Sequence, residues 1–337
     1  MSVLKEMSHR GVGLAAATLL AVALAACGAS AAAPAASPTT SSFKLQSEYV
    51  KLVQDVGPSV VLIETNVGLG SGIIFDAQGD IVTNNHVIAG SQIFLVVLSN
   101  GKQYQGSLVG SFAPDDLAVI RIQATGLHPA TFANSSNLQV GDIVMAIGNP
   151  LGLQSSVSEG IVSAMRTAIP EGNGVTLPSA IQTTAAINPG NSGGALIDLS
   201  EQVVGIPTLA ATDPQLGGGA APGIGFAIPS NTISLIAKQL IASGSVTNSG
   251  RAALGAQVGN TGGSGAMVTS VKSGGPAALA GVKVGDIITA IGGQSVTGAQ
   301  VVADVLVTLK PGQQVTVNLT HSDGTKAAVS VTVTELQ

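Results

Sequence analysis

The sequence predicts a mainly β protein with a larger domain built from β-barrels and a smaller α+β domain behind it. Short runs rich in Val, Ile and Leu recur along the chain with Gly or Asn turns between them, which is typical of barrels. Glycine is abundant, at 44 of 337 residues, and long charged helical stretches are absent. A chain of this length also exceeds the usual size of one domain.

The first 26 residues are typical of an export signal. A polar stretch with Lys5 and Arg10 precedes an uncharged run of 16 residues, which is shorter than the roughly 20 residues of a membrane span. The run ends in "LAAC", which resembles the lipobox of bacterial lipoproteins and implies cleavage before Cys27 and lipid attachment to it. The alternative is an uncleaved N-terminal anchor. Either arrangement holds the protein in the bacterial cell envelope, outside the cytoplasmic membrane.

Residues 27–42 are low in complexity and rich in Ala, Ser and Pro, which predicts a flexible tether. The composition becomes globular from residue 43, and we expect the larger domain over 43–245. Its predicted strands are 59–65, 70–76, 79–88, 91–104, 116–122, 141–150, 158–165, 195–209 and 223–229. The clearest helix covers 231–244, with Asn231 as its N-cap and Gly244 at its end.

The smaller domain is expected over residues 250–337. Strands are predicted at 253–258, 265–271 and 285–296, and an alternating pair at 313–321 and 326–333 closes the unit. Two helices are predicted between them, at 275–281 and 298–309. Mixed elements on this scale predict a small α+β domain.

Charge and composition exclude several functions. The formal net charge is −5 and the chain has no basic run, which argues against a nucleic-acid partner. Cys27 is the only cysteine, so no internal disulfide can form. No Cys/His cluster has metal-ligand spacing, and we expect neither a metal nor a cofactor.

The stretch "GNSGG" predicts a nucleophilic serine, Ser192, between glycines that permit a tight turn. A serine hydroxyl needs a base to take its proton, an acid to orient that base, and backbone N–H groups to hold the oxyanion. We assign the base to His86, at the end of the strand "GDIVTNNHV", and the oxyanion hole to Gly190, Asn191 and Ser192. The acid is one of the two aspartates in "DDLAVIRI". The order His, Asp, Ser is that of chymotrypsin-like proteases, in which two β-barrels meet at the cleft.

Several stretches together resemble the HtrA (Deg) family of serine proteases. They are "GLGSGIIF", "IVTNNHVI", "DDLAVIRI", "VMAIGNPLGL", "GIVSAMR", "IQTTAAINPGNSGGAL" and "GIGFAIPSN". The smaller domain, with "ALGA" and "GPAALAGVKVGDIITAIGGQSV", resembles the PDZ domain that follows the protease domain in that family. The family motif D-L-A falls on residues 116–118, which makes Asp116 the acid and Asp115 a solvated neighbour.

The resemblance implies an ATP-independent endopeptidase that acts on unfolded or damaged exported proteins without a cofactor. It also implies a homotrimer, for which Phe43 and Tyr49 are candidate contacts. The residues that correspond to the primary substrate pocket are Ile187, Leu209, Gly223 and Ile224. Because no acidic residue lies at the Ile187 position, we expect cleavage after small aliphatic residues such as Val or Ala. The alternative is a preference for basic residues, for which Asp213 in the loop 208–223 would be the acidic partner.

In the PDZ-like domain, the loop Ala253-Leu254-Gly255-Ala256 corresponds to the site that holds a peptide C-terminus, with strand addition beside it. Its small side chains predict weak affinity. The alternative is that this domain is only a spacer or an assembly element. For the whole chain, the alternatives are a non-proteolytic holdase or adaptor, and a regulatory protease with a single target.

Overall fold

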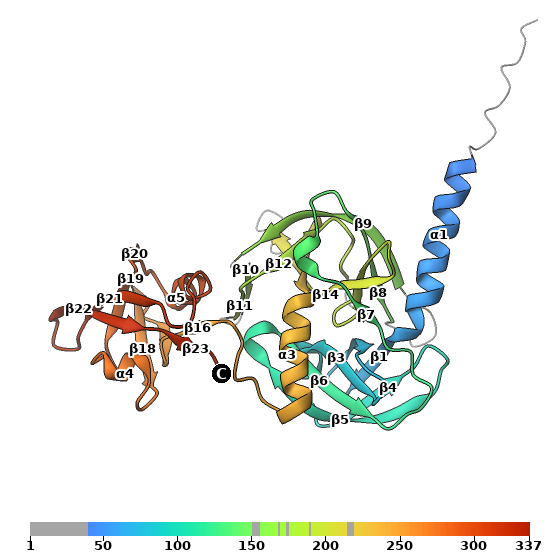
Figure 1. Ribbon diagram of the computed structural model, residues 1–337. Coiled ribbons are helices and arrows are strands. Elements are labelled where there is room, and N and C mark those ends of the chain that lie inside the picture. The colour runs from blue at the N-terminus through green and yellow to red at the C-terminus, as the bar shows by residue number, and fades with distance from the viewer. Residues whose placement is uncertain are drawn as a thin grey trace, which may run out of the picture. The chain divides into compact units, whose positions relative to one another are not determined.

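The computed structural model describes residues 40–149, 156–167, 169–172, 175–188, 190–213, 219–263 and 265–337 (Figure 1). The expected export signal, Cys27 and most of the expected tether lie outside these residues. No helix in the described part of the chain is long and apolar enough to cross a membrane.

Helix α1 (Thr40–Val56) begins in the expected tether, and the sequence analysis did not predict it. Leu52 and Val56 are buried, and Tyr49 and Val53 pack partly buried against the same core. These four residues follow the spacing of one helical face, which is the signal that could have predicted the helix. The short helix η1 (Gly57–Ser59) leads from α1 into the first strand.

The first barrel is closed and has the strand order β1-β2-β3-β6-β5-β4 (Figure 1). All of its neighbouring pairs are antiparallel, and its interior is filled by branched aliphatic side chains such as Ile63, Ile81 and Ile120, which are fully buried. The strands are β1 (Val60–Thr65), β2 (Leu69–Ile74), β3 (Asp80–Asn84), β4 (Phe94–Val97), β5 (Gln103–Phe112) and β6 (Leu117–Ile122).

The second barrel has the order β13-β8-β9-β12-β15-β14 and is closed by pairing of β13 with β14, while β7 adds a parallel edge to β14. Its strands are β7 (Thr131–Phe132), β8 (Ile143–Gly148), β9 (Ser156–Arg166), β12 (Ala180–Thr183), β13 (Ala195–Asp198), β14 (Gln202–Asp213) and β15 (Gly219–Pro229). A separate two-stranded sheet joins β10 (Ile169–Gly172) to β11 (Val175–Leu177).

Helix α3 (Ser230–Ser243) packs against strands of both barrels and carries the buried side chains Ile233, Ile236 and Leu240. The predicted end is confirmed, because the helix stops at Ser243 and Gly244 follows as its C-cap, in the left-handed conformation. The predicted N-cap is wrong, because the helix already begins at Ser230. The side chain of Asn231 instead accepts a hydrogen bond from the backbone N–H of Ser135 in the short helix η3 (Ser135–Asn137).

The C-terminal domain contains one main sheet of order β17-β18-β19-β21-β22, with β20 paired to β19 and a separate β16–β23 pair. The strands are β16 (Ala252–Ala253), β17 (Ala256–Asn260), β18 (Ala266–Val271), β19 (Ile287–Ile291), β20 (Gln294–Ser295), β21 (Gln314–Thr320), β22 (Lys326–Thr332) and β23 (Thr334–Glu335). Helices α4 (Pro276–Leu279) and α5 (Ala299–Leu306) complete it. The predicted fold class, mainly β with barrels before a small α+β domain, is confirmed.

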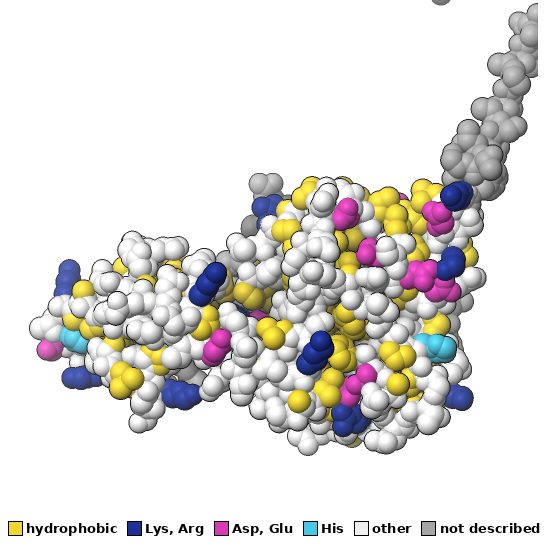
Figure 2. Space-filling view, viewed as in Figure 1, with side chains coloured by type: hydrophobic (Ala, Val, Ile, Leu, Met, Phe, Trp, Pro, Cys, Tyr) yellow, Lys and Arg dark blue, Asp and Glu magenta, His cyan; other side chains and the backbone are white. Residues whose placement is uncertain are grey.

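Charged side chains are sparse on the face of the molecule in Figure 2, and its Lys and Arg residues are scattered over it. No group of three or more His, Cys, Asp and Glu side chains within the described ranges could hold a metal ion.

Candidate active site

The end of the first barrel brings His86 and Asp116 together. Strands β3 and β6 pair with Asn84 opposite Leu117, so the residues just beyond these positions lie side by side. His86 lies in the short helix α2 (Asn85–Ile88), one turn that directly follows β3, and not at the end of a strand as predicted. Asp116 lies between the short helix η2 (Ala113–Asp115) and β6.

The two side chains interact through both carboxylate oxygens of Asp116. The imidazole Nδ1 of His86 lies 2.7 Å from Oδ2, and the backbone N–H of His86 donates to Oδ1 over 2.8 Å. The carboxylate is buried, whereas the imidazole is 48% exposed. A carboxylate held on Nδ1 fixes the tautomer in which Nε2 can accept a proton.

Asp116 is itself held from several sides. Its backbone has φ 51°, a left-handed conformation that is uncommon outside glycine. Its carbonyl oxygen accepts hydrogen bonds from the Asn85 N–H and the Asn84 side chain. The hydroxyl of Thr208, in β14 of the second barrel, donates to Oδ2 over 2.7 Å. The sequence analysis missed Thr208, because no local pattern marks its contact with a residue of the other barrel.

Asp115 is not the solvated neighbour that the sequence predicted. Its side chain is 1% exposed, and one carboxylate oxygen lies 2.7 Å from Nη1 of Arg251. The other oxygen is buried without a hydrogen-bond partner in the described part of the chain. Burial raises the pKa of Asp115 above its ordinary value, although the nearby guanidinium opposes this. The structure therefore separates the two aspartates, with Asp116 alone against the histidine.

Ser192 lies in a tight turn between β12 and β13. The turn contains two glycines with left-handed backbones, Gly190 at φ 102° and Gly193 at φ 81°. A Cβ atom on Gly193 would lie 2.1 Å from the Ser71 carbonyl oxygen, so only glycine fits there. The carbonyl oxygen of Ser192 accepts a hydrogen bond from the Ser71 N–H over 2.9 Å.

The predicted oxyanion-hole residues share this turn. Asn191 is buried, and its side chain donates to the Ala186 carbonyl oxygen, so the side chain braces the turn. Among the described residues, no protein group accepts a hydrogen bond from the N–H of Gly190 or of Ser192. Two unengaged N–H groups on either side of Asn191 have the chemistry that an oxyanion hole requires.

Ser71, in β2, ties the first barrel to this turn, and the sequence analysis assigned it no role. Its hydroxyl donates to the Gly190 carbonyl oxygen over 2.6 Å and accepts from the Asn149 N–H over 2.8 Å. Thr83 in turn donates to the Ser71 carbonyl oxygen. Ser71 is fully buried, so water cannot replace its hydroxyl as the hydrogen-bond partner of the Gly190 carbonyl oxygen and the Asn149 N–H.

Strand β14 links the turn to the acid. The Gly193 N–H donates to the Pro207 carbonyl oxygen over 3.2 Å, and the next residue, Thr208, contacts Asp116. Two consecutive residues of one strand therefore hold both the serine turn and the aspartate. The His86–Asp116 pair and the turn that holds Ser192 therefore lie against the same strand.

The predicted pocket residues gather around β15. Ile187 packs against Gly225, where an added Cβ would lie 2.4 Å from the isoleucine side chain. Gly223 and Ile224 precede that glycine on β15 and are both exposed. Leu209 lies in β14, and its backbone pairs with Phe226 of β15.

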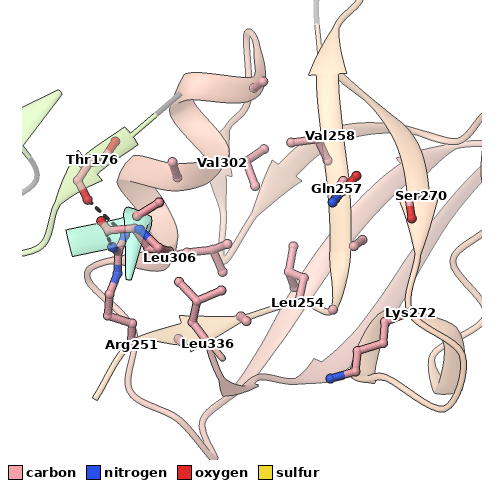
Figure 3. Close-up of a pocket in the computed structure, with 18 residues that line it drawn as sticks. Thr176, Arg251, Leu254, Gln257, Val258, Ser270, Lys272, Val302, Leu306 and Leu336 are labelled. Carbon is pink, nitrogen blue, oxygen red and sulfur yellow. Dashed lines mark hydrogen bonds between the residues drawn. The ribbon is translucent and has the colours of Figure 1, made fainter. Parts of the chain in front are cut away.

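In the C-terminal domain, the loop at 253–256 connects β16 to β17. Leu254 is buried in the domain core, and Gly255 has φ 71°. The Gly255 carbonyl oxygen accepts from the Lys272 N–H and the Leu254 carbonyl oxygen from the Ala277 N–H, which fixes the loop. Figure 3 shows Leu254 beside a groove that Val302 and Leu306 of α5 line from the other side.

Family comparisons agree with this division of the chain. Residues 70–206 match the trypsin-like peptidase domain and residues 252–333 match the PDZ domain. Serine protease PepD of Mycobacterium tuberculosis is 38% identical, over 96% of this chain and 74% of that protein. A probable periplasmic DegP-like serine endoprotease of Chlamydia trachomatis is also 38% identical, over 79% of this chain and 54% of that protein.

Solved structures give the same result. The HtrA-type protease AlgW with a decapeptide matches with a TM-score of 0.60 and 30% identity, over 86% of this chain and 99% of that one. A serine endoprotease from Yersinia pestis matches with a TM-score of 0.59 and 35% identity, over 86% of this chain and 98% of that one. The two barrels thus have the chymotrypsin-like fold of a protease domain, and a PDZ domain follows them.

Proposed function

Because the chain belongs to the HtrA family of serine proteases, we propose that it is an ATP-independent endopeptidase that cleaves unfolded or damaged exported polypeptides with Ser192 as its nucleophile. One observation carries the assignment of residues. His86 and Asp116 are paired at the end of the first barrel, and strand β14 contacts both Asp116 and the turn that holds Ser192.

In the proposed reaction, His86 Nε2 takes the proton of the Ser192 hydroxyl while Oγ attacks the carbonyl carbon of the substrate. Asp116 stabilises the imidazolium that forms, through the hydrogen bond to Nδ1. The tetrahedral intermediate then expels the amine, which takes the proton from Nε2 and leaves an acyl-enzyme ester. Water attacks this ester with His86 again as the base, which releases the acid and restores Ser192.

The backbone N–H groups of Gly190 and Ser192, with Asn191 between them, are the proposed oxyanion hole. Each such donor contributes about 3 kcal/mol to stabilising a tetrahedral intermediate when it points at the oxyanion. The Gly190 carbonyl oxygen accepts a hydrogen bond from the Ser71 hydroxyl, and the Asn191 N–H of the same peptide unit donates to the Asn188 carbonyl oxygen. These two bonds support a fixed orientation of this turn. The donors require no metal and no cofactor.

We propose that substrates are cleaved after small aliphatic residues such as Val or Ala. The support comes from Ile187, which fills space against β15 beside Gly225, and from the exposed Ile224 next to it. Both side chains are apolar and uncharged, which favours an aliphatic substrate side chain. Leu209 and Gly223 are the remaining proposed members of this pocket.

The PDZ domain is proposed to bind the C-termini of polypeptides at the loop of residues 253–256. An extended peptide would add to β17, whose outer edge pairs with no described strand. AlgW, one of the similar structures, has been solved with a decapeptide. The small side chains of Ala253 and Ala256 favour weak and reversible binding.

The location proposed for the protein is outside the cytoplasmic membrane, in the bacterial cell envelope. The relatives from Chlamydia trachomatis and Brucella suis are described as periplasmic. We further propose lipid attachment at Cys27 after cleavage of residues 1–26, and a homotrimer. Tyr49, one of its candidate contacts, packs partly buried against the protease core, and Phe43 lies in α1.

The test compares casein cleavage by the full chain with that by Ser192→Ala, without nucleotide and with a chelator present. We expect cleavage by the wild type alone, and covalent labelling of Ser192 alone by a fluorophosphonate. His86→Ala and Asp116→Asn should also abolish labelling. Binding of unfolded casein without cleavage or labelling, even when C-terminal peptides are added, would favour the holdase and refute the proposal.

A further inference from the structure

We infer that the PDZ domain selects C-termini with an acidic penultimate residue, and that Lys272 is the residue that reads it. This inference rests on the proposed peptide-binding role of the domain. It concerns the polar part of the cavity's lining, where exposed side chains of β17 and β18 lie beside the apolar walls.

The apolar walls of the groove can receive only every second side chain of an extended bound peptide. The cavity lies between β17 and α5 and has a volume of about 590 Å³ (Figure 3). Its apolar walls include Leu254, Val258, Val302 and Leu306, and its polar lining includes Gln257, Ser270 and Lys272. Successive side chains of an extended chain point to opposite faces. A peptide that adds to β17 with its terminal side chain in the groove therefore directs its penultimate side chain to the other face.

That other face is polar. Gln257 of β17 is exposed and pairs in register with Ser270 of β18, which is also exposed. Lys272 follows Ser270 by two residues, and its backbone N–H donates to the Gly255 carbonyl oxygen, so it lies opposite the carboxylate-binding loop. Paired residues on one face of neighbouring strands lie close enough to interact. The three polar side chains thus line the face that receives the penultimate residue.

The ammonium group of Lys272 is available for a carboxylate. In the described part of the chain, its contact is the neutral side chain of Gln337, at the outer limit of a hydrogen bond, 3.5 Å. No carboxylate of the described residues lies within ion-pair distance of it. In Figure 3, Lys272 extends from the end of β18 toward the side of the groove where Leu254 lies.

The distance between Lys272 and the bound peptide favours glutamate over aspartate as the penultimate residue. A peptide added to β17 would lie two strand spacings, about 10 Å, from β18. A lysine and a glutamate side chain extended toward each other cover this gap above Gln257, whereas the shorter aspartate reaches less far. Charge complementarity therefore points to a C-terminus with an apolar last residue preceded by glutamate.

The experiment measures binding of fluorescent decapeptides to the full chain carrying Ser192→Ala, which prevents cleavage. Two peptides end in Glu-Leu and Gln-Leu and are otherwise identical. We expect a roughly two- to fivefold preference for the Glu peptide, the range of an exposed ion pair, and its decline with added salt. Lys272→Met should remove this preference and leave binding of the Gln peptide unchanged, and Lys272→Glu should reverse it. Lys310→Met, a change of an exposed lysine away from the groove, is the matched control.

The outcomes separate this inference from the function on which it rests. Equal binding of the two peptides by the wild-type domain, or a preference that survives Lys272→Met, would overturn the inference alone. A Lys272→Met variant that weakens both peptides equally would assign the ammonium group to the terminal carboxylate, which also overturns it. If neither peptide binds, both the peptide-binding role and the inference are overturned.

Discussion

Ser71→Ala tests whether the first barrel controls the order of the nucleophile turn. The substitution removes one hydroxyl from a fully buried position in β2 and changes no charge. It leaves the Gly190 carbonyl oxygen and the Asn149 N–H without the hydrogen bonds that Ser71 provides. Because Gly190 is a proposed oxyanion donor, the effect should appear in the reaction and not only in stability.

The size of the expected effect follows from the two groups that lose their hydrogen-bond partner. A buried polar group that loses its partner costs about 1–3 kcal/mol, so the pair costs roughly 2–6 kcal/mol unless the turn rearranges. If the turn moves to recover its hydrogen bonds, the conformation that can react becomes less populated. The free-energy difference between the two conformations is then the cost of the two lost hydrogen bonds. The lower figure corresponds to a loss of about 30-fold, since about 1.4 kcal/mol is a factor of ten.

The assay is the second-order rate of fluorophosphonate labelling of Ser192, together with kcat/KM for a peptide substrate. We expect both to fall about 30-fold or more in Ser71→Ala, with kcat affected more than KM. Ser107→Ala, an exposed position on β5 of the same barrel, should leave both unchanged. A folded Ser71→Ala enzyme that labels within about twofold of the wild type would refute the reasoning, whatever its Tm.

Two further predictions concern the residues around the acid. Thr208→Val removes a charge-assisted hydrogen bond to the Asp116 carboxylate, so kcat should fall about tenfold or more. Thr208→Ser keeps the hydroxyl and should retain activity. Equal kcat values for Thr208→Val and the wild type would contradict this prediction. Burial raises the folded-state pKa of Asp115, so its stabilising contribution is present below about pH 4 and is lost as pH rises through the folded-state pKa. Urea unfolding from pH 4 to 7 should therefore show wild-type stability falling relative to that of Asp115→Asn, and parallel curves for the two proteins would exclude the effect.

The sequence alone identified much of the chemistry as candidates. "GNSGG", "NNHV" and "DDLAVIRI" carry a serine, a histidine and an aspartate in an order that a local pattern can reveal. The alternation of β-branched runs and glycine turns likewise predicted the barrels and the small α+β domain, because side-chain periodicity is a local property. The register of β3 and β6 then brings His86 and Asp116 to the same barrel end. The residue pattern by itself had left the choice of acid open between Asp115 and Asp116.

Only the tertiary structure decided which groups surround these residues. Thr208 is 92 residues from Asp116 along the chain, and Ser71 is 119 residues from Gly190, yet both pairs share a hydrogen bond. Asp115 is buried against Arg251, although the sequence analysis predicted a solvated position for it. Such contacts depend on how the strands pack across the protein, and nothing in the residues beside each group records them. The sequence therefore determined the reactive groups, and the packing of distant strands determined how each one is held.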